Sequence, residues 1–428
     1  MTELLVLRRR FVVLTFLRWF PIGLVLPVLV LMPRARGISL PTVGALFAAY
    51  GATTLLLELP SGSLSDVVGR RAVLLASGVL TTLGMAVFAF GQTVWVLLAG
   101  MLLKGAGRAL DSGPLESWYV DSAHAVDRAA DLKPALARSA AACAVALAAG
   151  SLAGGGLVFV APLPETGRAV VLALSAPYLC AMAFGILSLL FVAAWVDDAV
   201  ATGDHATWRS VARDVPRTVR AGSRLAAASP VLRRLGARSA AFGAVITAVE
   251  VLSPVQFGES AGAGAFSALV TVAFLGTALG ARLGPGVARL VGGSNRALLV
   301  STCLAALGLA CLAMPWWWAA AVAYVAFYAV MGIDDPIAGE LLHAETGPEQ
   351  RATILSVQSL LMMGGGLLGN LAVPLLAASV GFDVSWLVVA GAALGSALLA
   401  IGLPSRVASP VESDVVPPPV VPGRQLTP

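Results

Sequence analysis

The amino-acid sequence predicts an all-α integral membrane protein with about twelve transmembrane helices. Of the 428 residues, 58% are hydrophobic and only 12% are charged, whereas a soluble domain carries about 25% charged residues. The mean hydropathy is +0.88. A helix that crosses a membrane needs about 20 apolar residues, and about twelve runs of this kind follow one another along the chain. The chain is therefore built for a lipid environment.

The predicted helices follow these apolar runs in chain order. They cover residues 11–32, 42–60, 72–92, 94–118, 135–160, 169–196, 237–257, 264–283, 297–314, 319–343, 352–379 and 384–403. The first run is too long to be a secretory signal peptide and lacks a small-residue cleavage site, so we interpret it as the first span.

A polar segment divides these helices into two groups of six. We predict an N-terminal half over 1–196, a cytoplasmic linker over 197–236, a C-terminal half over 237–405 and a disordered, proline-rich cytoplasmic tail over 406–428. Arginines recur in the linker at helical spacing, which predicts a helix lying on the inner leaflet. They are Arg209, Arg213, Arg217, Arg220 and Arg224.

Basic residues gather on one side of the predicted spans. Arg8–Arg10, Arg70, Arg71 and the linker arginines fall on this side, whereas Arg34, Arg36 and Arg168 fall on the other. Because loops rich in arginine and lysine stay in the cytoplasm, both termini are predicted to be cytoplasmic in a multi-pass protein of the cell membrane. The net charge of +5 then reflects anchoring at the inner leaflet and not nucleic-acid binding.

A compact motif lies between the second and third predicted helices. It reads Gly62-Ser-Leu-Ser-Asp66-Val-Val-Gly69-Arg70-Arg71. The glycines allow the helix ends to approach closely, and Asp66 offers a carboxylate to the start of a neighbouring helix. The pattern resembles the loop between helices 2 and 3 of the major facilitator superfamily, whose members are secondary transporters.

Other segments are similar to the same superfamily. Gly284–Gly292 keeps part of the first motif at the equivalent place in the second half. Ser112–Asp121 resembles the end of helix 4 in bacterial efflux-type members, and Arg351–Ser356 resembles the start of their helix 11. The resemblance covers residues 5–405 and implies two pseudo-symmetric halves of six helices each.

The resemblance also implies a conformational gate at the cytoplasmic ends of the helices. In this gate, Asp66 would contact the helix that starts near Arg351, and Glu116 and Asp121 would pair with Arg70 or Arg71. The predicted gate residues are Gly62, Asp66, Gly69, Arg70, Arg71, Glu116, Asp121 and Arg351.

Six ionisable residues are predicted to lie inside the membrane, where a charged group is costly and is usually paired, functional or in contact with water. Lys104, Arg108 and Asp111 follow at i, i+4 and i+7 on one face of a single helix. Three carboxylates on other helices, those of Glu250, Asp334 and Asp335, are candidates to balance the surplus positive charge. We predict that the six form a site for substrate binding and proton coupling. The alternative is a static charge network that locks helices 4, 7 and 10 together. They are Lys104, Arg108, Asp111, Glu250, Asp334 and Asp335.

Three further features each allow two interpretations. Pro336 cannot donate to the carbonyl of Gly332, so this segment is either a broken helix whose second part is capped by Asp335, or a plain kink. Arg18 either extends to the inner headgroups, which we favour, or faces a cavity. The run Gly150–Gly156 resembles the glycine-rich helix 5 motif of drug–proton antiporters without its proline, and otherwise forms a packing surface.

Several classes of function are disfavoured. The chain contains no Gly-rich loop ending in Gly-Lys-Ser/Thr and no His-Glu-x-x-His, and its three histidines do not cluster. The four cysteines lack metal-binding spacing. We therefore predict that the protein is not an enzyme and uses neither a cofactor nor a metal.

The predicted function is secondary active transport by a monomer. It exports a small organic compound, such as a drug or metabolite, by proton antiport through alternating access. Its partners are a small-molecule substrate, protons and the lipid bilayer, without nucleic acid. A proton-coupled uptake symporter is the alternative, and a transport-inactive membrane sensor or scaffold is the rival from another class. The sequence does not identify the substrate.

Overall fold

The computed structural model describes residues 2–61, 68–111, 113–197, 229–346 and 351–404, together with Leu64 and Arg224. Within these ranges the chain is helical and has no strand, which confirms the all-α fold class. The predicted linker arginines before Arg224, most of the predicted gate loop including Gly62 and Asp66, and the predicted tail lie outside the described residues.

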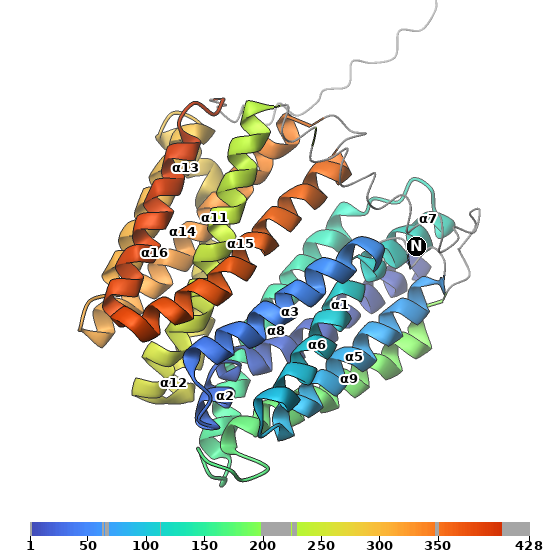
Figure 1. Cartoon of the computed structure of the whole chain (residues 1–428). Helices are drawn as coiled ribbons and strands as arrows, with labels where there is room; N and C mark the ends of the chain where they lie inside the picture. Colours follow the sequence, from blue (N-terminus) through green and yellow to red (C-terminus); the bar gives the residue numbers. More distant parts are fainter. Residues whose placement is uncertain are drawn as a thin grey trace, which may run out of the picture.

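The first group of helices forms one side of the molecule (Figure 1, blue to green). Short segments α2 (Leu31–Ala35) and α7 (Pro114–Val126) connect longer helices, and single 3₁₀ turns lie at Leu26–Val28 and Ala173–Ser175. The longer helices are α1 (Thr2–Val25), α3 (Leu40–Ser61), α5 (Arg70–Phe90), α6 (Val94–Leu110), α8 (Lys133–Val160) and α9 (Ala176–Trp195).

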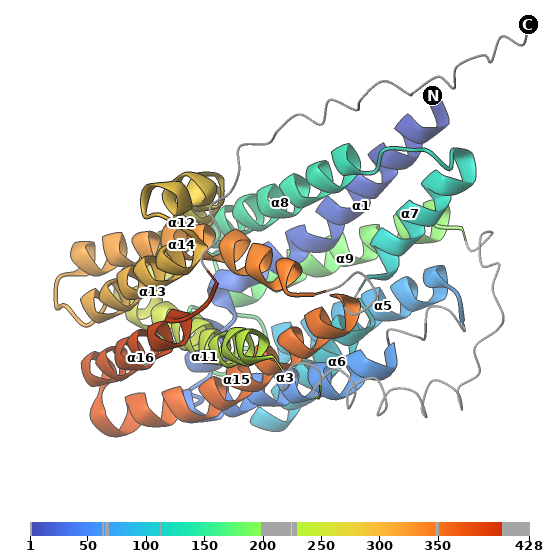
Figure 2. The same cartoon turned by 90° about the horizontal axis from the view of Figure 1, so that it is seen from above.

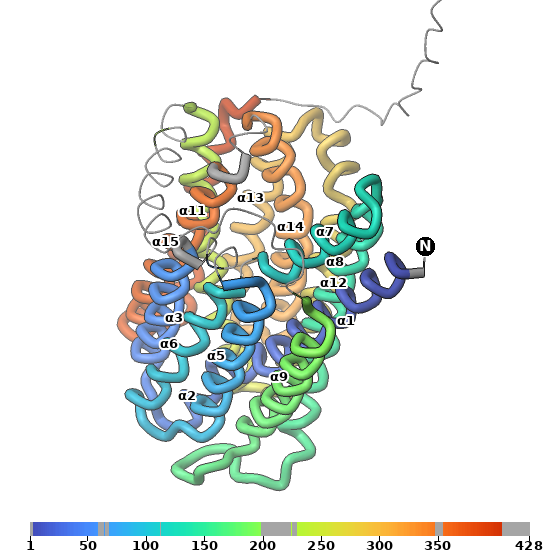
Figure 3. The backbone as a smooth tube through the Cα atoms, turned by 90° about the vertical axis from the view of Figure 1, so that its right-hand side faces the viewer, coloured from blue at the N-terminus to red at the C-terminus, as the bar shows by residue number. Residues whose placement is uncertain are grey.

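The second group lies beside the first (Figure 2), and Figure 3 shows α3, α5, α6 and α9 in front of it. A π-helical turn at Pro254–Gly258 joins its first two helices without a loop, and a 3₁₀ turn at Leu398–Ala400 follows its last. The helices are α11 (Pro230–Ser253), α12 (Glu259–Leu290), α13 (Ser294–Cys311), α14 (Trp317–Ala344), α15 (Arg351–Val380) and α16 (Phe382–Ala397).

The number of spanning helices agrees with the sequence prediction. Within the described residues, ten helical stretches are long and apolar enough to cross a membrane. One of them, residues 230–290, contains both α11 and α12. The 17-residue helix α6 is not among the ten, although it is apolar and packs between α3 and α5. Two groups of six spans result.

Several predicted boundaries are wrong. The predicted linker over 197–236 ends too late, because α11 begins at Pro230. The predicted fourth helix over 94–118 is interrupted, because α6 ends at Leu110 and α7 begins at Pro114. Gly113 lies between them with φ of 97°, a left-handed conformation that glycine adopts without steric cost. The predicted loop around Gly284–Gly292 is mostly helical, because α12 continues to Leu290 and the turn that follows ends at Gly293.

Among the described residues, the core cluster that joins the two groups lies at one end of the molecule. At the end that carries α2, one cluster of buried side chains includes Leu24 and Val28 of the first group together with Val249 and Phe266 of the second. At the other end, where the N-terminus lies, each group has a separate core, around Trp118 in the first and in the second around the helix ends of α11, α13 and α14.

Glycines allow the two groups to approach closely at the shared core. A side chain at Gly155 of α8 would collide with Ser267 of α12, and one at Gly44 of α3 would collide with the backbone of Asn370 in α15. The Thr271 hydroxyl donates to the carbonyl of Ala148 at 3.2 Å across the same interface. The run Gly150–Gly156 therefore serves as a packing surface, one of the two interpretations of its sequence.

Candidate functional site

A cavity of about 680 Å³ lies between the two groups of helices. Its wall comes from α1, α3, α5, α6 and α9 on one side and from α11, α12, α14 and α15 on the other. Most of the lining is apolar or aromatic, which is typical of sites for small organic molecules. The charged residues of the wall are Arg18, Lys104, Arg108, Asp111 and Glu250.

One ion pair lies in the wall of the cavity. Arg18 Nε of α1 donates to Asp111 Oδ2 at 2.6 Å, and Arg18 Nη2 donates to the Asp111 carbonyl at 3.0 Å. The position of Asp111 at the C-terminal end of α6, and not within a longer helix, makes both of its oxygen acceptors available to one guanidinium. Arg18 therefore faces the cavity, and our preference for an extension to the headgroups is wrong.

Two other cations stand one turn apart on α6. Lys104 Nζ lies 5.6 Å from the centre of the Phe88 ring, a cation–π distance. Gly84 of α5 makes room for the Lys104 stem, since a Cβ there would lie 2.6 Å from Lys104 Cγ. Among the described residues, neither Lys104 nor Arg108 makes a hydrogen bond or an ion pair. The α6 face thus presents two cations without a hydrogen bond or an ion pair among the described residues, although Asp111 interacts electrostatically with Arg108.

Glu250 is the carboxylate of the opposite group of helices. It belongs to α11, and its side chain is exposed to the cavity. Three phenols lie within its electrostatic reach, Tyr50 of α3 and the neighbouring Tyr324 and Tyr328 of α14. The two α14 rings are 5.0 Å apart. Within the part of the chain described here, Glu250 forms no ion pair.

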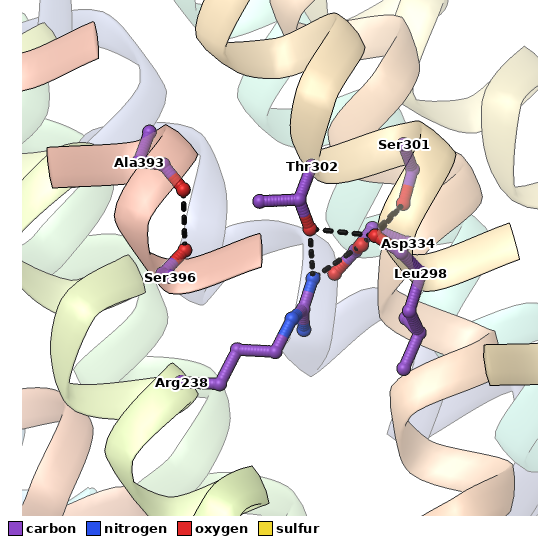
Figure 4. Close-up of polar contacts among 7 residues, drawn as sticks. All are labelled: Arg238, Leu298, Ser301, Thr302, Asp334, Ala393 and Ser396. Carbon is purple, nitrogen blue, oxygen red and sulfur yellow. Dashed lines mark hydrogen bonds and ion pairs between the residues drawn. The ribbon is translucent and has the colours of Figure 1, made fainter. Parts of the chain in front are cut away.

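A second ion pair is sealed inside the second group of helices (Figure 4). Arg238 Nη2 of α11 donates to Asp334 Oδ1 at 2.5 Å and to Thr302 Oγ1 at 3.0 Å. The Ser301 hydroxyl donates to the same Asp334 oxygen at 2.6 Å. The side chains of Arg238 and Asp334 are only 11% and 8% exposed. Asp334 is therefore satisfied within its own group of helices.

The predicted grouping of Asp334 and Asp335 with the α6 cations is thus wrong. Neither residue is part of the cavity wall, and the Asp335 side chain is exposed elsewhere. Of the two interpretations of Pro336, the broken helix is absent, because α14 runs from Trp317 to Ala344 with the proline inside it. Spacing along one helix indicates a shared face, but it does not identify the neighbouring helix against that face.

The two ion pairs occupy equivalent places in the two groups. Arg18 and Arg238 belong to the first span of each group, and Asp111 and Asp334 to the fourth. The third spans supply Ser77 and Ser301, each beside its aspartate. Each of the three positions is separated from its counterpart by about 220 residues. Arg238 is not among the predicted site residues, so this repeat goes beyond the sequence prediction.

The predicted gate is described only in part. Arg70 at the start of α5 forms an ion pair with Asp121 of α7, as the sequence predicts, and Arg71 Nη2 donates to the carbonyl of Ala193 at 2.6 Å. Gly69, with φ of 89°, precedes α5. Glu116 is exposed on α7, and nothing is described of the Arg351 side chain.

The spans, the cavity between two similar groups of helices and its buried charges define the class of a multi-pass membrane transporter. The sequence model of the Major Facilitator Superfamily matches residues 11–333. The chain belongs to this superfamily.

Three curated relatives share short stretches with the chain. The inner membrane transport protein YajR of Escherichia coli K12 is 30% identical over 92 residues, 21% of this chain and 20% of that protein. The class C tetracycline resistance protein of Escherichia coli is 33% identical over 173 residues, 40% of this chain and 39% of that protein. The class E protein of the same species is 35% identical over 96 residues, which is 22% of this chain and 24% of that protein. The chain thus matches less than half the length of each relative.

Solved transporters share the fold. The nucleoside transporter NupG superposes with a TM-score of 0.75 at 14% identity, covering 93% of this chain and 98% of that one. A POT family transporter bound to a thioalcohol-conjugated peptide gives 0.70 at 12% identity, covering 92% and 94%. At these identities the likeness concerns the arrangement of the helices only.

Proposed function

We propose that the protein exports a small organic compound by proton antiport, working as a monomer that alternates between two accessible states. The observation that carries this proposal is Glu250, an ionisable carboxylate exposed to a largely apolar cavity without an ion-pair partner among the described residues. The partial similarity to two tetracycline resistance proteins favours export.

The proposed coupling follows from the cost of charge in the cavity. A carboxylate that faces apolar and phenolic groups is more easily accommodated when it binds a proton. Glu250 would load a proton on one side of the membrane and release it on the other, while substrate binds when the proton leaves. Lys104, Arg108 and Asp111 would form the opposite wall of the same site.

The proposed conformational change uses the two ends of the molecule differently. The two groups of helices share a core at the α2 end, whereas the described core clusters at the end with the N-terminus each belong to one group, so this state would be closed at the first end and open at the second. With both termini in the cytoplasm, which the distribution of arginine favours, this state faces inwards. Asp66, the start of α15 and the Arg70–Asp121 pair would form the gate that closes the opposite state.

Transport in everted membrane vesicles tests the proposal. The lumen is acidified by respiration and a panel of amphiphilic compounds is added. We expect some compounds to release protons from the lumen only in vesicles that contain the protein, and to accumulate inside. Movement of a compound out of the lumen together with protons would instead identify the uptake symporter. A panel that moves in neither direction, in folded protein, would favour a sensor or scaffold.

A further inference from the structure

The cavity wall carries an excess of positive charge on the side of α6. Arg18 and Asp111 satisfy each other through two hydrogen bonds. Lys104 and Arg108 remain, one helical turn apart, and neither has an ion pair in the described part of the chain. Both side chains reach the cavity wall.

Glu250 does not neutralise these two cations. No ion pair joins it to Lys104 or Arg108 in the described ranges. Tyr50 of α3 interacts electrostatically with Arg108 and Asp111 and also with Glu250. The cavity therefore has a positive region on α6 and a separate region of phenols and one carboxylate on α11 and α14.

An uncompensated cation in a mostly apolar cavity gains more from an anionic partner than it would in water. A guanidinium offers a planar fork of donors to an oxyanion, and an ammonium adds a compact charge beside it. The remaining lining supplies an apolar and aromatic surface, including Met101, Phe266, Phe274 and Met362. A volume of about 680 Å³ suits a molecule with two or three rings.

We propose that Lys104 and Arg108 bind the oxyanion of an amphiphilic organic anion whose apolar body lies against the aromatic wall. The substrate class is thus an organic carboxylate, sulfonate or phosphate with an aromatic or aliphatic body. This inference rests on the proposed transport function, because it takes the cavity to be the substrate site.

A pair of matched fluorescent probes tests the inference by equilibrium binding to the whole protein in nanodiscs. The anion 8-anilinonaphthalene-1-sulfonate and the neutral N-phenyl-1-naphthylamine share the same rings and differ by the sulfonate. Signal from empty nanodiscs is subtracted. The test variant is Lys104→Gln with Arg108→Gln. The matched control, Lys133→Gln with Arg282→Gln, removes the same charge from exposed positions outside the cavity wall.

We expect the test variant to lose about tenfold or more in affinity for the anion and less than about twofold for the neutral probe. The control variant should bind both probes as the wild type does, and Lys104→Arg with Arg108→Lys should keep most of the affinity for the anion. Three results would each overturn the inference. They are wild-type protein that binds the anion no better than empty nanodiscs, a test variant that keeps its affinity for the anion, or an equal loss for both probes.

Binding needs no gradient and no turnover, so the two proposals fail separately. If the test variant selectively loses affinity for the anion and the wild-type protein transports no compound, the anion site is supported and the proposed export function is refuted. Proton-coupled export by the Lys104→Gln, Arg108→Gln variant with unchanged affinity for the anion would refute the anion site alone.

Discussion

At the scale of single residues, the cavity and the sealed pair show two ways to keep a charge inside a membrane protein. Asp334 accepts hydrogen bonds from Arg238 and Ser301, so its charge is satisfied by the protein. Glu250 has phenols near it but no cation within ion-pair distance among the described residues. A charge satisfied by the protein serves its stability, whereas one left to the cavity is available to a proton or a ligand.

Replacing Glu250 by Gln removes the proposed proton site while it keeps the shape of the side chain. We expect proton release driven by substrate in everted vesicles to fall by about tenfold or more, because the amide cannot bind and release a proton. Glu165→Gln, at an exposed position outside the cavity wall and the predicted gate, is the matched control and should keep coupling. Wild-type coupling in the Glu250→Gln variant would remove this residue from the mechanism.

The sealed pair should act on stability instead. Arg238→Met leaves Asp334 buried without its cation, which we expect to cost about 3 kcal/mol of unfolding free energy. The double variant Arg238→Met, Asp334→Leu removes both charges and should recover most of that loss. Arg34→Met breaks the more exposed Arg34–Glu259 pair and should cost less than about 1 kcal/mol.

Thermal unfolding midpoints in one detergent compare the variants. If the double variant unfolds at a lower temperature than Arg238→Met, the unpaired charge of Asp334 is not the cause of the loss, and the prediction is wrong.

At the scale of elements, the connection between α6 and α7 determines where two acidic side chains lie. The chain turns at Gly113, so Asp111 ends α6 inside the cavity wall while Asp121 on α7 meets Arg70. If α6 continued into α7 without the turn, both carboxylates would lie on one continuous helix. The break lets one segment of sequence serve the cavity and the predicted gate.

Gly113→Ala should destabilise this connection. Its φ of 97° is costly for any residue with a Cβ, by about 1–2 kcal/mol, although no atom lies within 4 Å of the added carbon. Gly391→Ala is the control, since it lies within helix α16 with open space around it and should be neutral or stabilising. Unfolding midpoints distinguish the two, and equal effects would refute a strain specific to Gly113.

The sequence predicted the elements better than the neighbours of their side chains. Hydrophobic runs depend on local composition, which is why nearly every predicted span has a counterpart. The break at Gly113 was missed because the polar interruption over 111–113 is short and is followed at once by Pro114 and Leu115, and hydropathy does not report φ. The partner of Asp334 depends on how α11 packs against α14, and a single sequence read one helix at a time does not contain that information.

At the scale of the whole molecule, the two groups of helices touch where their glycines meet. The close contacts at Gly155 and Gly44 lie at the shared core, and the Arg34–Glu259 pair adds a link at the same end. The opposite end has two separate cores. The described state is therefore held together from one end, which is the geometry that a rocking motion of two rigid groups requires.

A bulky residue at Gly155 should disfavour this state. Gly155→Leu would collide with Ser267, whereas Gly156→Leu has open space and is the matched control. Spin labels at exposed Ser39 and Ser260, on different groups at the α2 end, report the separation. We expect the Gly155→Leu variant alone to gain a component of longer distances. An unchanged distribution in folded protein would show that the contact does not set the conformational equilibrium.

The repeated Arg–Asp–Ser arrangement also bears on how such a protein can change over generations. In the second group, Asp334 accepts hydrogen bonds from Arg238 and Ser301, and none of these three residues lines the cavity. Substitutions that adapt the cavity to a different substrate therefore leave the Arg238–Asp334 pair of the second group intact, so specificity can change without a loss of stability in that group. In the first group, the equivalent ion pair of Arg18 and Asp111 lies in the cavity wall itself. A mutation there would change both the specificity of the cavity and the stability of the fold. Adaptive substitutions should accordingly accumulate on the α11, α12 and α15 walls before they reach Arg18 or Asp111.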